Sequence, residues 1–286
     1  MEQNFKYQLE RYSGQSTRHT CPKCNKKRNF ARYVDFDGNY VGDDIGRCNS
    51  EQSCGYHNPP NGNTLTNGDF VYIKPETTYL NGSDIEREMY KDNLFKFLCS
   101  KFNVDEVKSV FNKYIVRSTD KKWKNSTVFY QRDIEGRYRT GKIISYNGSD
   151  GKRIKEPFSR IYWMHNFVTK YKFELEQCLF GEHLLESFDS NKGDIYLVES
   201  EKTCLIASLQ FKNDLFIATG GLSNLNRKKL KVLDGYRVEA LPDKGGYNLW
   251  KEKLEPLGIT VNTVMEDSLE SNDGDDIADV ILMQKL

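Results

Sequence analysis

The chain has 286 residues, of which 37% are hydrophobic and 29% charged, with 42 Lys and Arg against 41 Asp and Glu. This length predicts two or three modules. No apolar run approaches the roughly 20 residues that span a bilayer, and none follows the first residues as in a signal peptide. We therefore expect a cytoplasmic protein without a membrane partner. The net charge of +1 does not by itself indicate a nucleic-acid-binding protein.

Four of the seven cysteines lie near the N-terminus, as the pairs Cys21 and Cys24, then Cys48 and Cys54. A Cys-x2-Cys turn presents two thiolates to one point, and four thiolates complete a tetrahedral zinc site. Between the pairs, residues 29–36 predict a strand, Asp37-Gly38 a hairpin turn and residues 40–41 the start of a return strand. The pattern predicts a zinc ribbon over residues 1–58, too short to fold without its metal.

The gap of five residues between Cys48 and Cys54 is wider than usual, which leaves His57 or His19 as an alternative ligand. Soft thiolates favour the all-cysteine site. Basic residues around the first pair favour nucleic acid as the ribbon's partner. The remaining cysteines lie among apolar neighbours and are expected to be buried thiols; they are Cys99, Cys178 and Cys204.

A polar stretch rich in Pro, Gly and Asn follows the ribbon and predicts a linker over residues 59–80. Helices are expected over residues 85–102 and 105–114, the second capped by Asp105. Residues 126–132 and 137–144 predict a β-hairpin. Together these elements predict an α+β middle module over residues 81–190.

Aromatic and basic side chains alternate through this hairpin. They are Trp123, Phe129, Tyr130, Arg132, Arg137, Tyr138, Arg139, Lys142 and Tyr146. Rings beside phosphate-binding cations suit single-stranded nucleic acid. A half-buried strand with a charged outer face gives the same alternation, so a purely structural role is the alternative.

From residue 194 onward, short apolar segments alternate with helical ones. Strands are expected at residues 195–198, 215–219, 236–241 and 259–264, and helices at 201–211, 225–233, 247–257 and 277–283. This alternation predicts a parallel sheet with helices on both faces, over residues 191–286. Ligands bind beyond the carboxyl ends of such strands, where Glu199, Gly220 and Asp243 are expected.

Glu199 and Asp243 offer the hard carboxylate oxygens that suit Mg²⁺. The alternative is that they cap the helices that follow them. Residues 266–279 are strongly acidic, and we expect a solvated loop there in which Asp276 caps the last helix.

These strand ends resemble the Toprim domain of primases, topoisomerases and related nucleases, in Val198-Glu199 with Lys202, Thr219-Gly220-Gly221 and Pro242-Asp243. In that family a Glu and an Asp-x-Asp hold Mg²⁺ for phosphoryl chemistry. The resemblance implies that Glu199 and Asp243 are catalytic metal ligands. The second Asp falls at Gly245, so the missing carboxylate must come from elsewhere or the site is inactive. The candidates to supply it are Asp275, Asp276 and Glu201.

The middle segments, from Val128-Phe-Tyr to Leu179-Phe-Gly-Glu, follow the order of a bacterial or phage primase core. The sequences Gly46-Arg-Cys48-Asn and Val198-Glu-Ser-Glu-Lys202-Thr are similar to those of uncharacterised Toprim-like proteins of Bacteroides-type phages and mobile elements. The expected fold is α/β, mixed α+β overall. It comprises an N-terminal zinc ribbon, an α+β middle subdomain and a C-terminal Toprim-like, Rossmann-type parallel sheet.

The resemblance implies a primase-like protein that binds single-stranded DNA, or RNA, in replication or transfer of a mobile element. It would join nucleoside triphosphates with Mg²⁺ or Mn²⁺, as a metal-dependent nucleotidyltransferase, and hold structural zinc. A helicase or relaxase is the expected protein partner. The alternatives are an inactive Toprim DNA-binding accessory protein and a small Toprim nuclease. The side chains expected to bind nucleic acid are Lys142, Lys152, Arg153, Lys155 and Lys202.

Overall fold

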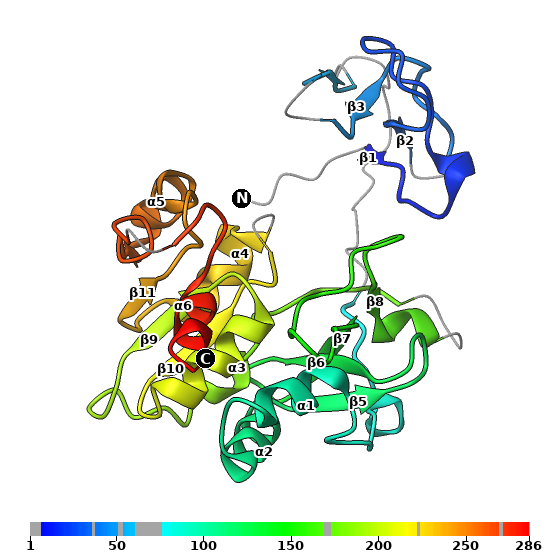
Figure 1. The fold of residues 1–286 in the computed structure, drawn as a ribbon. Coiled ribbons are helices and arrows are strands. Elements are labelled where there is room, and N and C mark those ends of the chain that lie inside the picture. The colour runs from blue at the N-terminus through cyan, green and yellow to red at the C-terminus, as the bar shows by residue number, and fades with distance from the viewer. Residues whose placement is uncertain are drawn as a thin grey trace. The chain divides into compact units, whose positions relative to one another are not determined.

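The chain divides into two compact units, residues 1–75 and 76–286, in the computed structural model (Figure 1). The structure describes residues 7–35, 38–50, 54–60, 76–168, 173–221, 224–268 and 271–285. Asp37 of the predicted hairpin turn and residues 61–75 of the predicted linker lie outside these ranges. Across the described residues, no helix combines the length and apolar character needed to cross a membrane.

The first unit is a small antiparallel sheet. Its strands, in spatial order, are β1 (Gln8–Leu9), β2 (Phe30–Val34), β3 (Gly46–Cys48) and β4 (His57–Asn58). The return strand β3 begins later than predicted, and Tyr40 makes only an isolated bridge to Val34. Gly46 is required here, because an added Cβ would lie 2.2 Å from the backbone oxygen of Ala31.

The second unit contains an antiparallel sheet of four strands. In spatial order they are β5 (Val116–Thr119), β6 (Ser126–Arg132), β7 (Tyr138–Ile144) and β8 (Ile161–Trp163). Strands β6 and β7 form the predicted hairpin, with Tyr130 opposite Gly141. An added Cβ at Gly141 would lie 2.8 Å from the Val128 and Met164 side chains, so a glycine lets this layer pack closely.

Two helices, α1 (Asn93–Cys99) and α2 (Val104–Lys113), precede this sheet. The predicted helix over residues 85–102 was too long, because buried Asp92 caps α1 by accepting a hydrogen bond from the Phe95 amide (2.9 Å). The cap of α2 was also predicted wrongly. Asn103 rather than Asp105 accepts from the first-turn amides, and asparagine caps a helix as well as aspartate does.

A parallel sheet follows, as predicted. Its spatial order is β10 (Leu215–Ala218), β9 (Ile195–Val198), β11 (Val238–Ala240) and β12 (Thr260–Val261). Its helices are α3 (Glu201–Gln210), α4 (Arg227–Leu230), α5 (Tyr247–Leu254) and α6 (Ile277–Met283). Short 3₁₀ helices lie at Gln15–Thr17, Gly82–Asp84, Met164–Phe167, Glu182–Leu184, Lys231–Leu233 and Glu255–Leu257.

One hydrophobic core joins both sheets of the second unit. The buried Tyr114 hydroxyl, at the end of α2, is hydrogen-bonded to Ser208 Oγ of α3 and donates to the Phe216 carbonyl of β10 (both 2.8 Å). The predicted boundary between residues 190 and 191 falls inside this unit. The main core contains residues from both sides of that boundary, which fixes the two sheets against each other.

Candidate functional site

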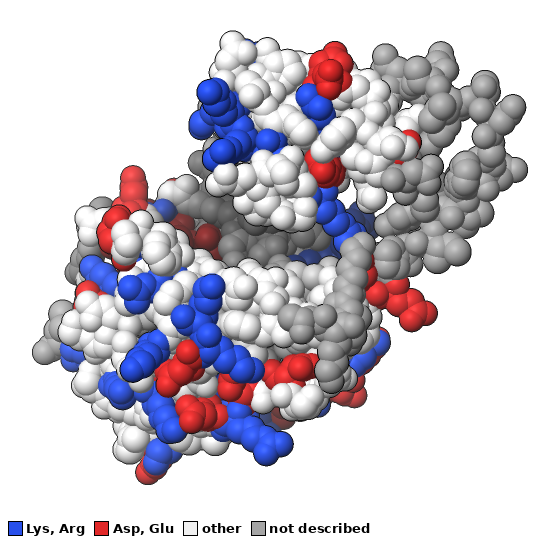
Figure 2. All heavy atoms as spheres, turned by 90° about the vertical axis from the view of Figure 1, so that its right-hand side faces the viewer, with Lys and Arg blue, Asp and Glu red and all other residues white. Residues whose placement is uncertain are grey.

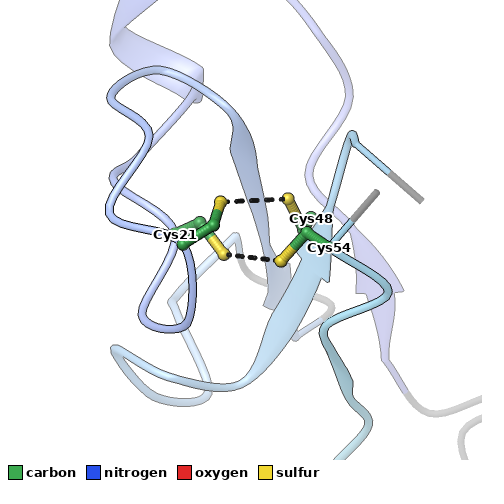
Figure 3. Close-up of side chains that lie close together, drawn as sticks. Cys21, Cys48 and Cys54 are labelled. Atoms are coloured by element: carbon green, nitrogen blue, oxygen red, sulfur yellow. Dashed lines mark hydrogen bonds between the residues drawn. The ribbon is translucent and has the colours of Figure 1, made fainter. Parts of the chain in front are cut away.

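The four predicted cysteines of the first unit converge on one point (Figure 3). Cys21 Sγ lies 3.7 Å from Cys54 Sγ, and Cys24 Sγ lies 4.0 Å from Cys48 Sγ. Four thiolates about 2.3 Å from a tetrahedral zinc ion would lie about 3.8 Å apart. The donor set and its spacing therefore fit a structural zinc ion.

Neither candidate histidine belongs to the cysteine cluster. His57 Nε2 is hydrogen-bonded to the Tyr33 hydroxyl (2.9 Å), and His19 Nε2 lies 3.6 Å from a Glu10 carboxylate oxygen without a hydrogen bond. Asn29 supports the cysteine cluster by donating to Cys48 Sγ (3.2 Å). The structure thus gathers four sulfur ligands. Of the other cysteines, Cys178 and Cys204 are buried and Cys99 is half-buried.

In the second unit, three loops meet at the carboxyl edge of the parallel sheet, because β9 lies between β10 and β11. Glu199 directly follows β9, and its backbone oxygen accepts from the Gly220 amide beyond β10 (2.9 Å). Asp243 lies three residues beyond β11. We call this edge the rim, defined by Glu199, Thr219–Gly221 and Asp243.

The rim concentrates negative charge. Burial, together with the nearby carboxylates of Asp276, Glu199 and Asp279, raises the pKa of Asp243 to about 7. Neither Glu199 nor Asp243 caps a helix, so that alternative was wrong. Ser200 caps α3 by accepting from the Thr203 amide (3.1 Å), and Gly246 occupies the cap position of α5.

The three candidates for the missing carboxylate differ in their surroundings. Asp276 caps α6 as predicted, accepts from the Thr203 hydroxyl and contributes to the pKa rise at Asp243. The Asp275 carboxylate accepts a hydrogen bond within its own loop, from the Asn272 amide (2.7 Å). Glu201 is 2% exposed and is held in an ion pair. Of the three, Asp276 is the candidate that interacts with Asp243.

Asp276 nevertheless does not complete a tight triad. Among the described residues, the cysteines are the group of three or more potential ligands whose donor atoms all lie within 4.8 Å of one another. Gly245, which stands where a second Asp was expected, has φ +85° and donates its amide to Glu266 (2.8 Å). The donor set that remains, Glu199 and Asp243, still fits Mg²⁺, which is commonly held by one or two carboxylates, substrate phosphates and water.

A cleft of about 940 Å³ opens beside the rim. Glu199 and Asp276 line it, and so do all five side chains that the sequence suggested for nucleic-acid binding. These are Lys142, Lys152, Arg153, Lys155 and Lys202. Residues that are distant in sequence are thus brought into one cleft with carboxylates and cations together.

Lys142 is placed differently from the other four cations. It is 8% exposed, and its Nζ donates to both carboxylate oxygens of Glu201 (3.1 Å each) and to the Gly220 carbonyl (3.0 Å). Lys229 Nζ donates to the adjacent Thr219 carbonyl (3.0 Å). Burial lowers the pKa of Lys229 to about 8. Two buried ammonium groups therefore hold the loop after β10.

Sequence reasoning missed this arrangement and misjudged several rings. Nothing in the chain marked Lys229 or the pairing of Lys142 with Glu201. Phe129, Tyr130 and Tyr146 are at most 4% exposed, so the suggestion that they stack on bases was wrong and they belong to the core.

The chain belongs to a family described as a domain of unknown function (DUF6371), whose model matches residues 92–244. The model of a zinc beta-ribbon finger matches residues 5–69. No curated protein matches the chain.

Solved structures that resemble the chain include primase domains. The primase fragment of the bacteriophage T7 primase-helicase has a TM-score of 0.41 and 14% identity, over 94% of this chain and 98% of that one. The Aquifex aeolicus primase has a TM-score of 0.37 and 18% identity, over 66% of this chain and 57% of that one. A DnaG primase catalytic domain bound to single-stranded DNA has a TM-score of 0.37 and 14% identity, over 69% of this chain and 60% of that one. The chain thus spans less than two thirds of the last two proteins.

Proposed function

We propose that the second unit binds single-stranded nucleic acid in the cleft and uses a divalent metal ion at Glu199 and Asp243 for primase-like primer synthesis. One observation carries this proposal: Glu199 and Asp276 share the cleft with Lys152, Arg153 and Lys155. Both carboxylates also act on Asp243, since their charges help to raise its pKa. The sequence resemblance to Toprim primases supports the same reaction, and the resemblance to uncharacterised Toprim-like proteins of phages and mobile elements suggests a role in such an element.

Each part of the cleft has a role in such a reaction. Joining nucleotides requires a 3′-hydroxyl to attack an α-phosphate, so positioning and neutralisation of charge contribute most of the rate. A Mg²⁺ or Mn²⁺ ion would supply Lewis-acid chemistry when bound. The exposed cations Lys152, Arg153 and Lys155 would bind template or triphosphate oxygens. Lys142 would instead fix the rim, because its ammonium group is already engaged.

The test is a gel assay with labelled nucleoside triphosphates, single-stranded DNA and Mg²⁺ or Mn²⁺. Wild type should make oligonucleotides, and Asp243→Ala should lower the rate by roughly a hundredfold or more, because a lost metal ligand costs at least as much as a lost supporting residue. Asp234→Ala is the matched control, since Asp234 is an exposed carboxylate outside the rim. Equal synthesis by wild type and Asp243→Ala would contradict the proposed site.

A second function is favoured by a specific observation. Gly245 brings no carboxylate and Asp276 is engaged as a helix cap, as expected of a rim that has lost catalysis. The chain would then be a DNA-binding accessory protein. It would shift single-stranded DNA in a gel with a steep salt dependence but make no product. Degradation of the strand without added nucleotides would instead identify a nuclease.

A further inference from the structure

An aromatic cluster outside the rim joins two surface segments of the second unit. The Trp123 ring centroid lies 6.5 Å from those of both Phe158 and Tyr162. Tyr162 in turn lies 5.3 Å from Phe167. Phe158 is 56% exposed, more than any other described phenylalanine. A cluster of aromatic rings that reaches the surface suggests a contact with a partner.

The cluster has a fixed base and an open outer ring. Trp123, Tyr162 and Phe167 pack against a second hydrophobic core that includes Tyr130 and Met164. Phe158 belongs to neither of the two hydrophobic cores of this unit. The core therefore accounts for three of the four rings, and it leaves the exposure of Phe158 without a structural reason.

The two segments that carry Trp123 and Phe158 are rich in basic residues, although Lys121 is paired with Glu86. Residues 121–124 contain three lysines, and residues 152–160 contain four basic residues against one acid, Glu156. Lys122 Nζ lies 4.4 Å from the centroid of the Tyr162 ring, within the range of a cation–π contact. On the face drawn in Figure 2, the larger unit carries gathered basic side chains with acidic ones between them. Aromatic faces beside cations complement both bases and phosphates.

One segment, residues 152–158, runs from the cleft to the cluster. Residues 152–156 line the cleft, and Phe158 follows two residues later on the same segment. Trp163 of β8 also lines the cleft. Its neighbour Tyr162, which belongs to the cluster, points to the opposite face of the strand. Because β8 is the edge strand of its sheet, the cluster lies around this edge from the cleft. A strand bound along Lys152 to Lys155 would meet Phe158 next.

We propose that Phe158, supported by Trp123 and Tyr162, is a stacking platform for the bases of a single-stranded nucleic acid that extends from the cleft. The proposal rests on the proposed function, because it requires a single strand to be bound in that cleft. It adds a binding contact that needs no metal ion and no catalysis.

The test measures fluorescence anisotropy with a labelled oligothymidylate and with an abasic strand of the same length. Phe158→Ala should weaken binding of the oligothymidylate by roughly five- to a hundredfold, the usual contribution of one stacked base. Binding of the abasic strand should not change, because that strand keeps its phosphates and lacks bases. Phe158→Tyr should retain binding, since the ring is preserved. Phe211→Ala, at a ring 41% exposed, is the matched control and should bind like wild type.

The outcomes separate the two proposals. If wild type and Phe158→Ala bind equally well while Lys155→Ala binds weakly, the stacking role of Phe158 is refuted and the binding of single strands in the cleft is supported. An equal loss of both strands on Phe158→Ala would also refute stacking. If wild type binds neither strand, both proposals fail, and a protein partner becomes the explanation for the exposed rings.

Discussion

Two buried lysines hold the rim, and one of them makes the stability of the fold depend on pH. Lys229 Nζ donates to the Thr219 carbonyl, and burial lowers its pKa from 10.5 to about 8. At a pH between these two pKa values, Lys229 is protonated in the unfolded chain and deprotonated in the folded chain. Stability therefore rises with pH across this window.

The matched variant is Lys229→Met, which keeps the aliphatic stem and removes the titration. We predict that the free energy of unfolding of wild type, minus that of the variant, rises by roughly 1 to 3 kcal/mol between pH 7.5 and pH 10. Urea unfolding at several pH values measures this difference. A difference that stays constant, or that falls as the pH rises, would show that Lys229 does not titrate in this window.

Gly245 offers a gain-of-function test at the same scale. An added Cβ would meet no atom within 4 Å, and aspartate tolerates a positive φ better than most residues. Gly245→Asp should therefore fold, with a modest loss of stability, and should tighten Mn²⁺ binding by adding a carboxylate to the rim. Gly245→Asn has the same shape without the charge. If the two variants bind Mn²⁺ equally, position 245 does not face the metal.

Sequence reasoning worked for residues whose partners are local and failed for those with distant ones. Asp276 was predicted as the cap of α6 because the amides that donate to its carboxylate lie two and three residues ahead. The ion pair of Lys142 with Glu201 spans 59 residues, and only the packing of the two sheets reveals it. Lys142 was placed in the cleft for its charge, although its ammonium group is buried.

At the scale of elements, the ribbon depends on its metal more than on its strands. Its hydrophobic core consists of Cys21, Phe30 and Cys48, with Cys54 and Tyr56 packed against it. Such a core cannot offset the conformational entropy of the chain. The spacing of the cysteines predicted this unit well, because metal ligation rather than the strand propensity of its residues specifies its fold.

We predict that removing zinc unfolds the first unit. After chelation, hydrogen exchange should lose protection in β2 and β3, whereas β6 and β7 in the second unit keep theirs, because a hydrophobic core and not metal holds them. Cys48→Ser should show the same pattern without a chelator. Protection of β2 that persists once metal analysis shows no zinc would contradict this account.

The helices and strands of the second unit were predicted correctly where the hydrophobic pattern and the capping or turn residues indicate the same boundaries. The hairpin of β6 and β7 and the helix α6 match their predicted positions closely. The long helix over residues 85–102 was wrong at its start, because its apolar spacing continues N-terminal to Asp92, whereas the Asp92 carboxylate caps the first turn of α1. Apolar periodicity alone does not reveal where a cap begins a helix.

At the scale of the whole molecule, the order of the parallel sheet produces the site. Placing β9 between β10 and β11 sets Glu199 beside Gly220 and Asp243. The alternation of strands and helices predicted a rim at this edge. It could not predict the basic wall, because residues 152–155 come from the loop before β8, and the shared core of the two sheets sets their position.

The central claim is that the rim holds a divalent metal ion through Glu199 and Asp243. The most direct measurement is electron paramagnetic resonance of free Mn²⁺ titrated with zinc-loaded protein, comparing wild type with Asp243→Asn. The account predicts that wild type removes Mn²⁺ from solution and that the variant binds it roughly tenfold or more weakly. Equal depletion of free Mn²⁺ by both proteins, or by neither, would contradict it.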